Sequence, residues 1–526
     1  MSRAGLALLL ALVAPVIARP AAARSADALW LPNLFGEHMV LQHGRPVPLW
    51  GLALPGHEVA VLLDGEEIAS ATAPADEDGR WHLQLPPRPP SAPHVLEVIT
   101  RLPGDATPLE TRRFGAVAFG EVWIVAGGTN AAWPLRLTPD VGRVGTGSPD
   151  LRFLPVPARV AQRPQDDVAA RWSRGLPDEA RDVSALAWFF GSRLQQALQR
   201  PVGVIVVTRN LTTIAPWIPE AGYAAVPGAA PVLARLEQDT RAYHDALRVR
   251  LDALDAWLAA TTAALEGDAP LPPAPDVPRH PLTDPHAPTG LFLGSIAALS
   301  PLPVAGVVWY QGERDVGDEE PYAHLLPALV LGWRDAFGHP GLPFVVVQLP
   351  PHDYRDHRAT EPFSAAPDPL RLPRFWAAQQ RVLELPHTSL AVVHDGVDPA
   401  DAFPPDKRPF GERTARLALA EVYGLDLAAH GPVYARRERD GARLRLTFHH
   451  AEGLATRDGL PPDHFELRDT EGVWHAAEAE LDGDTLWVAS SRVPEPTGVR
   501  LGWHQQASPN LVNAAGLPAR AFVDAP

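Results

Sequence analysis

The sequence predicts an α/β protein in which a parallel β-sheet covered by helices is flanked by N-terminal and C-terminal antiparallel β-domains. Two patterns support this prediction. Segments that alternate in polarity and are separated by turn dipeptides occupy both ends of the chain, as is typical of antiparallel sheets. The middle has continuous β-branched runs separated by helical patterns, as expected for a buried parallel sheet. The length of 526 residues is enough for several domains.

The first β-domain is expected over residues 30–115, with a sandwich-like arrangement. Alternating apolar residues identify its strands, among them Val59, Val61 and Leu63, and then Trp81, Leu83 and Leu85. Turn dipeptides such as Asp64-Gly65 separate these strands. The same alternation returns near the end of the chain and predicts a second β-domain over residues 430–526.

The α/β domain is expected over residues 116–428. Its predicted strands are Val122–Ala126, Val202–Val207, Gly306–Tyr310, Phe344–Gln348 and Leu390–Val393. Helical patterns over 184–198, 322–337 and 411–423 separate some of these strands. Active sites of such sheets gather at the carboxyl ends of the strands, so the residues that follow each run are the first candidates for chemistry.

An insertion over residues 229–288 is expected to interrupt this domain. An amphipathic helix over 231–261 is predicted by apolar residues at spacings of three and four, which are Tyr243, Leu247, Leu251, Leu254 and Leu258. We expect its apolar face to pack on the domain rather than to bind a partner. The proline-rich stretch 269–288 predicts an irregular, partly stiff connector.

The N-terminus and the composition restrict the class of protein. Arg3, the apolar run 4–18 and the small residues 21–23 predict a cleavable signal peptide over residues 1–23, which indicates a periplasmic or secreted protein. The run is too short to span a bilayer, so no membrane insertion is expected. The net charge of -16 disfavours nucleic acid as a partner. Because the chain has no cysteine, it has neither disulfides nor thiol chemistry.

Three motifs begin in predicted strands or just after one, in the order GEVWIVAGGTNAAWPL, VVWYQGERD and DPADAFPPDK. They resemble signature blocks that the sialate O-acetylesterase family of SGNH-type hydrolases writes as GQSNM, WYQGESN and DIHP. The resemblance continues in LPNLFGEHMVLQHGRPVPLWG near the start and NLVNAAGLPARAF near the end, so it spans nearly all of the chain after the signal segment. It implies an SGNH-hydrolase-like α/β domain and a carboxylic-ester hydrolase that acts on O-acetylated sugars.

The resemblance also implies a catalytic triad whose key residues have changed. Thr129 takes the place of the nucleophilic serine, Phe403 takes that of the histidine base, and the aspartate is Asp401 or Asp398. A phenyl ring cannot accept a proton, and loss of general-base help costs about 10²- to 10⁴-fold in rate. Threonine can serve as a nucleophile when a base is adjacent. His394 is a candidate displaced base, although a histidine bonded locally is the favoured interpretation.

The resemblance places further changes around the expected oxyanion and substrate-binding positions. Leu211, after Asn210, replaces a glycine, and we expect its side chain to restrict an unusual backbone angle there. Gly128 replaces a glutamine of the family. The retained polar residues are Asn130, Gln311 and Glu313. They are interpreted either as a buried set in which Gln311 and Glu313 pair and hold two loops together, or as part of a sugar pocket.

These substitutions favour a secreted sialate O-acetylesterase-like protein that is catalytically impaired and at most binds an O-acetylated sugar, another glycan or a partner protein. One alternative is an active carbohydrate O-acetylesterase that uses Thr129 with a displaced base such as His394. Another is a structural component of a polysaccharide-utilisation system in which the β-domains function. No metal and no cofactor are expected, because His352 and His357 match no specific zinc pattern.

Overall fold

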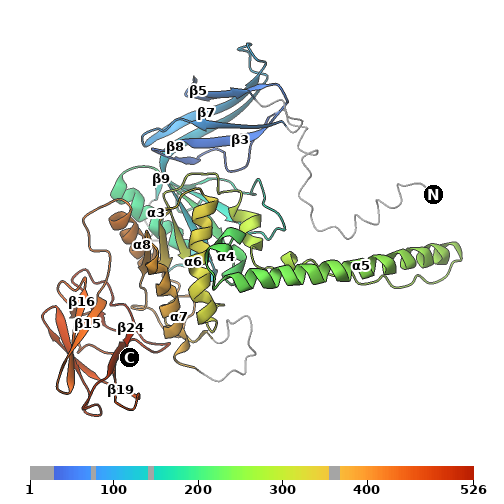
Figure 1. Ribbon diagram of the computed structural model, residues 1–526. Helices are drawn as coiled ribbons and strands as arrows, with labels where there is room; N and C mark the ends of the chain where they lie inside the picture. Colours follow the sequence, from blue (N-terminus) through green and yellow to red (C-terminus); the bar gives the residue numbers. More distant parts are fainter. Residues whose placement is uncertain (1–28, 73–78, 140–146, 355–367, 526) are drawn as a thin grey trace.

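The computed structural model describes residues 29–72, 79–139, 147–354 and 368–525 (Figure 1). The predicted signal segment and His357 lie outside these residues. A central layer of strands and helices lies between an N-terminal and a C-terminal β-domain, which confirms the predicted fold class (Figure 1). No helix in the described ranges is long and apolar enough to cross a membrane.

The N-terminal β-domain is continuous with the central sheet through one long strand. Three of its strands pair with one another: β1 (Leu29–Trp30), β3 (Val47–Ala53) and β6 (Arg80–Leu85). The others are β4 (Glu58–Leu63), β5 (Glu66–Thr72) and β7 (Ser91–Arg101), which join the first part of β8 (Glu110–Gly127). β2 (Val40–Gln42) also pairs with β8. Position 115, where the first domain was expected to end, therefore lies inside a strand that both sheets share.

The central sheet has the strand order β10-β9-β11-β8-β12-β13-β14. Its strands besides β8 are β9 (Ser148–Pro157), β10 (Ser173–Gly175), β11 (Val202–Thr208), β12 (Gly306–Tyr310), β13 (Phe344–Val347) and β14 (Thr388–Ala391). All neighbours pair in parallel except the edge strand β10. Parallel strands bring their carboxyl ends to one edge, and this edge carries the candidate site.

Helices cover both faces of this sheet. The main ones are α3 (Ala185–Leu198), α4 (Glu220–Ala225), α6 (Glu319–Ala336), α7 (Arg371–Gln380) and α8 (Arg408–Glu421). Trp309 lies opposite Ala126, three residues from Trp123, so the two tryptophans point to opposite faces. The Trp123 ring lies 5.1 Å from Phe190 of α3, whereas the Trp309 ring lies 6.1 Å from Trp333 of α6. Both faces are therefore buried, as the continuous apolar strands predict.

Helix α5 differs from the sequence prediction. It runs over Ala230–Glu266 and projects away from the α/β domain (Figure 1). Leu236, near its start, is its one buried residue, and Leu251 is 53% exposed. The expectation that the apolar face packs on the domain is therefore wrong for most of the helix. The proline-rich connector, rather than the domain, covers part of this face, because the Trp257 indole donates to the carbonyl of Pro272 at 2.8 Å.

The C-terminal β-domain has a core of its own, built around residues such as Leu446, Leu467 and Leu501. One four-stranded sheet contains β15 (Val433–Asp440), β16 (Arg443–His449), β21 (Thr485–Ala489) and β20 (Glu478–Asp482). Another contains β19 (Trp474–Ala476), β18 (Phe465–Arg468), β22 (Gly498–Leu501) and β24 (Phe522–Asp524). The short strands β17 (Ala455–Thr456) and β23 (Leu511–Val512) form a further pair.

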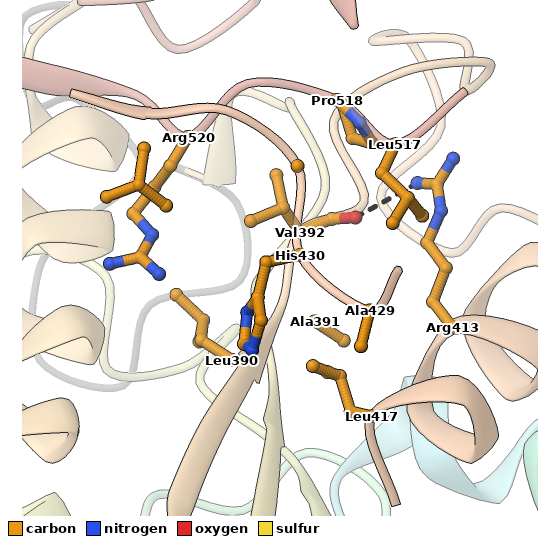
Figure 2. Close-up of a pocket in the computed structure, with 12 residues that line it drawn as sticks. Leu390, Ala391, Val392, Arg413, Leu417, Ala429, His430, Leu517, Pro518 and Arg520 are labelled. Atoms are coloured by element: carbon orange, nitrogen blue, oxygen red, sulfur yellow. Dashed lines mark hydrogen bonds between the residues drawn. The ribbon is translucent and has the colours of Figure 1, made fainter. Parts of the chain in front are cut away.

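This β-domain packs closely against the α/β domain. Figure 2 shows the contact, where side chains of β14 and α8 meet the segments around His430 and Arg520. The cavity left there is about 20 Å³, which is room for about one water molecule. Arg413 of α8 stabilises the edge of the contact by donating to the Val392 carbonyl at 2.9 Å (Figure 2).

Candidate functional site

The candidate site forms where β8, β11 and β12 end side by side. Gly127 is in register with Thr208 on one side and with Tyr310 on the other. The residues that follow these strands are the predicted site residues Thr129, Leu211 and Gln311. The parallel register thus brings together three predicted segments that are far apart in the sequence.

Glycine is required at the turn that presents Thr129. Gly127 has a φ of 146°, and a Cβ atom there would lie 1.9 Å from the Tyr310 carbonyl oxygen. The Gly128 amide donates to the same oxygen at 2.9 Å. Thr129 then begins the short helix α2 (Thr129–Ala132) and is half-buried. Strand end, turn and helix start therefore hold the Thr129 hydroxyl at the edge of the sheet.

Leu211 adopts the unusual backbone angle that its side chain was expected to restrict. Its φ is 56°, in the left-handed region, which costs a non-glycine residue about 1–2 kcal/mol. Its side chain is 49% exposed, so it points away from the core and does not block this conformation. Its amide donates to Thr129 Oγ1 at 3.1 Å. The donor expected from the replaced glycine is present despite the substitution, while Asn210 is exposed beside it.

Asn130 is the centre of a buried polar network. Its side-chain amide donates to Glu313 Oε1 at 2.7 Å and to the Ala402 carbonyl at 3.1 Å. Its side-chain oxygen accepts from Lys407 Nζ at 2.5 Å. Asn130 and Lys407 are both fully buried, and Glu313 is 4% exposed. This network joins the turn after β8 to the segment that contains Phe403.

Lys407 was not among the predicted site residues. Burial lowers the pKa of its amine to about 7, although the nearby carboxylates of Glu313 and Asp401 act in the opposite direction. The amine also lies 5.1 Å from the centre of the Phe410 ring and 5.6 Å from that of Trp133. In the sequence, Lys407 stands out only as the last residue of the motif DPADAFPPDK. That match does not indicate its contact with Asn130.

Gly128 and Glu313 are sterically coupled. A Cβ atom on Gly128 would lie 2.9 Å from Glu313 Oε2, which itself accepts from the Gly312 amide at 3.2 Å. A larger residue at position 128 would therefore require the Glu313 carboxylate to move. The small residue allows Glu313 to lie against the turn that carries Thr129.

Gln311 and Glu313 do not pair with each other, in contrast to one of the two interpretations of the sequence. The Gln311 amide donates to the Thr212 carbonyl at 2.9 Å and to Asp315 Oδ2 at 2.6 Å. Asp315 also accepts from the Ile214 amide at 3.1 Å. Gln311 and Asp315 therefore hold the loop that carries Leu211, whereas Glu313 holds the turn at Asn130.

This arrangement predicts a pH-dependent stability. Burial raises the pKa of Asp315 from its ordinary value of 3.8 to about 7. Between pH 3.8 and about pH 7, the Asp315 carboxyl stays protonated in the folded protein but loses its proton in the unfolded chain. The free energy of unfolding therefore falls as the pH rises through this range. Asp315→Asn removes the titration, and the thermal midpoint of the variant is expected to fall less than that of wild type from pH 4.5 to pH 7.5. The exposed control Asp335→Asn should follow wild type, and parallel curves for wild type and Asp315→Asn would contradict the assignment.

Phe403 lies next to the turn but supplies no proton acceptor. The Ala402 carbonyl, one residue before it, contacts Asn130, and the Phe403 ring is half-buried against the apolar core. Asp401 Oδ1 accepts from the Phe403 amide at 2.9 Å, and Asp398 Oδ1 accepts from that of Ala400 at 2.9 Å. Both candidate aspartates therefore stabilise local turns.

His394 makes no hydrogen bond to Thr129. It is fully buried three residues after the end of β14, and neither of its ring nitrogens has a hydrogen-bond partner among the described residues, so the expected local bonding is not found. Its ring centre lies 6.2 Å from that of Trp376. Burial lowers the pKa of His394 to about 4, so the imidazole is a weak base at neutral pH. The displaced-base hypothesis gains no support from its position.

The described residues contain no group of three His, Cys, Asp or Glu side chains that could hold a metal ion. His352 Nδ1 instead lies 2.9 Å from the carbonyl oxygen of Pro399. The polar groups gathered at the site are the Thr129 hydroxyl, the Leu211 amide and the buried polar network.

Comparisons with known proteins agree with this geometry. A family model described as carbohydrate esterase, sialic acid-specific acetylesterase, matches residues 294–388. The sialate O-acetylesterase of Rattus norvegicus is 26% identical over 445 residues, which cover 76% of this chain and 74% of the rat protein. The Homo sapiens sialate O-acetylesterase is 26% identical over 468 residues, which cover 81% of this chain and 78% of the human protein.

A solved structure extends the similarity to the whole fold. The crystal structure of a carbohydrate acetylesterase from Xanthomonas citri superposes with a TM-score of 0.76 at 27% identity, covering 94% of this chain and 99% of that chain. The fold and the edge at Thr129 therefore define a carbohydrate esterase scaffold of the SGNH type. Within that class, the chain is similar to sialate O-acetylesterases, and residues 294–388 match the family model of sialic acid-specific acetylesterases.

Proposed function

We propose that this chain is a catalytically impaired member of the family that binds an O-acetylated sugar at the Thr129 edge. The observation that carries the proposal is Phe403, which places a phenyl ring on the segment held against Asn130, where the family has its histidine. In the described part of the chain no histidine is hydrogen-bonded to Thr129, so its hydroxyl has no partner able to remove its proton. The predicted signal segment supports a periplasmic or secreted location.

Support for binding comes from the parts of the site that remain ordered. The Leu211 amide points at Thr129 Oγ1, and buried hydrogen bonds hold both flanking loops. Fixed polar groups of this kind orient a ligand without further rearrangement. An active esterase is the second candidate, because the same amide is placed to stabilise a developing oxyanion. That candidate requires a base other than His394.

Titration calorimetry with O-acetylated sialic acid, followed by proton NMR of the recovered ligand, tests the proposal. We expect binding, with the acetyl group intact after incubation. Leu211→Glu places a carboxylate beside Thr129 and should weaken binding, whereas Leu460→Glu changes a comparably exposed leucine of the C-terminal domain and should not. Absence of binding at millimolar ligand, or acetate release that Thr129→Ala abolishes, would overturn the proposal.

A further inference from the structure

Arg314 lies at the candidate site without a polar partner of its own. In the motif VVWYQGERD it takes the place of the serine that the family writes in WYQGESN. Its neighbours Glu313 and Asp315 are already engaged, because they accept hydrogen bonds from Asn130 and from the Ile214 amide. Arg314 is partly buried, its Nε is fully buried, and its guanidinium makes no hydrogen bond or ion pair with any described residue. The guanidinium is therefore fixed in place by its neighbours and free to bind a ligand.

Arg209 lies on the other side of the Thr129 turn. Its amide donates to the Gly127 carbonyl at 3.0 Å, two residues before Thr129. Its Nη1 donates to the Ala158 carbonyl at 3.2 Å, and it forms no ion pair within the described ranges. Arg209 follows β11 and Arg314 follows β12, which are the two strands that pair with the end of β8. Two arginines without acidic partners thus follow the strands on either side of Thr129.

His286 comes to the same edge from the connector after α5. The amide of Thr289, three residues further on, donates to the Ala215 carbonyl at 3.2 Å, which ties this segment to the loop after β11. Burial lowers the pKa of His286, and the charges of Arg314 and Arg209 lower it further. Because charges in solution are screened beyond about 10 Å, both guanidinium groups lie near the imidazole. We call Arg209, Arg314 and His286 the cationic cluster.

Little negative charge opposes the cationic cluster. Asp284 raises the pKa of His286, but its Oδ1 accepts from the His286 amide at 2.8 Å, and no ion pair joins it to Arg314 or Arg209 in the described structure. Nδ1 of His286 is buried and has no hydrogen-bond partner there either. Acids are abundant elsewhere, because the chain has 62 Asp and Glu residues against 46 Lys and Arg. A cleft edge with charges of one sign attracts ligands of the opposite sign.

We propose that Arg314, together with Arg209, binds the anionic group of an acidic sugar held at the Thr129 edge. A carboxylate and a sulfate both offer the pair of oxygens that a planar guanidinium binds with two parallel hydrogen bonds. The inference rests on the proposed function, to which it adds that the bound sugar is acidic. A serine at position 314 would carry no charge, so this subsite belongs to this chain and not to the motif that the chain resembles.

Titration calorimetry of the full chain with two matched pairs of sugars tests the subsite. O-acetylated sialic acid is compared with its methyl ester, and galactose 6-sulfate is compared with galactose. The wild-type chain is expected to bind the charged member of one pair about tenfold or more tightly than the neutral member, because charge-assisted hydrogen bonds are the stronger ones. The pair that shows the preference identifies the anionic group as carboxylate or sulfate.

Three variants assign the preference to Arg314. Arg314→Ser should bind both members of that pair with equal affinity. Arg314→Lys retains the charge without the planar fork and should keep part of the preference. The control Arg492→Ser removes an exposed arginine of the C-terminal β-domain and should leave the preference unchanged.

The outcomes separate this inference from the proposed function. Binding with equal affinities within both pairs would overturn the anionic subsite, while sugar binding at the site would stand. A preference that persists in Arg314→Ser would overturn the role of Arg314. Absence of binding by all four sugars would overturn the proposed function and this inference together.

Discussion

Thr129→Ser combined with Phe403→His is expected to raise acetate release from an activated aryl acetate by about 10²- to 10⁴-fold over the wild-type chain. The substitutions restore a serine hydroxyl and an imidazole on two segments that Asn130 already joins. The Leu211 amide, which donates to Thr129 Oγ1 at 3.1 Å, lies beside the nucleophile position. The rate is measured by release of the aryl alcohol at pH 7.5.

The single variants serve as controls for this gain. Because nucleophile and base act as a unit, Thr129→Ser alone and Phe403→His alone should each give much less than the double variant. Equal gains from Phe403→His and from the double variant would show that the threonine methyl does not matter. A folded double variant with no activity above wild type would contradict the view that the missing base is the main defect.

Asn130→Leu is expected to lower the free energy of unfolding by about 3–5 kcal/mol, because it leaves buried ionisable groups without their partner. Asn130 binds Lys407 Nζ, Glu313 Oε1 and the Ala402 carbonyl, and its side chain is fully buried in the folded chain. Urea unfolding followed by tryptophan fluorescence measures the loss.

A second substitution separates the network from simple packing. Lys407→Met removes the buried amine, so the double variant with Asn130→Leu should be more stable than the sum of the single effects predicts. Additive losses would indicate that Asn130 contributes by packing alone. A loss below about 1 kcal/mol in Asn130→Leu would contradict the assigned role of the network.

The fold class could be predicted from periodicity because each layer imposes its own pattern. Strand β6 alternates buried and exposed residues, and β12 is buried throughout, as the two kinds of sheet require. The position of α5 could not be predicted in this way. Its stripe of leucines has the same spacing whether it packs on the domain, on the connector or on another chain.

The candidate site residues were predicted from their resemblance to the family motifs. The rule that parallel strands end at one edge indicated that those after β8, β11 and β12 lie close together. The contacts between them were not predicted, since hydrogen bonds such as Asn130 to Lys407 join residues 277 positions apart. The backbone angle of Leu211 also differs from the expectation for its residue type, and hydrogen bonds from Gln311 and to Asp315 hold the loop that contains it.

The central claim is that Thr129 no longer acts as a nucleophile. Release of acetate from an activated aryl acetate by the wild-type chain, measured beside Thr129→Ala at equal concentration, tests it most directly. We expect the two rates to be equal and close to that of buffer. A wild-type rate at least tenfold above that of Thr129→Ala would contradict the claim and establish a working esterase.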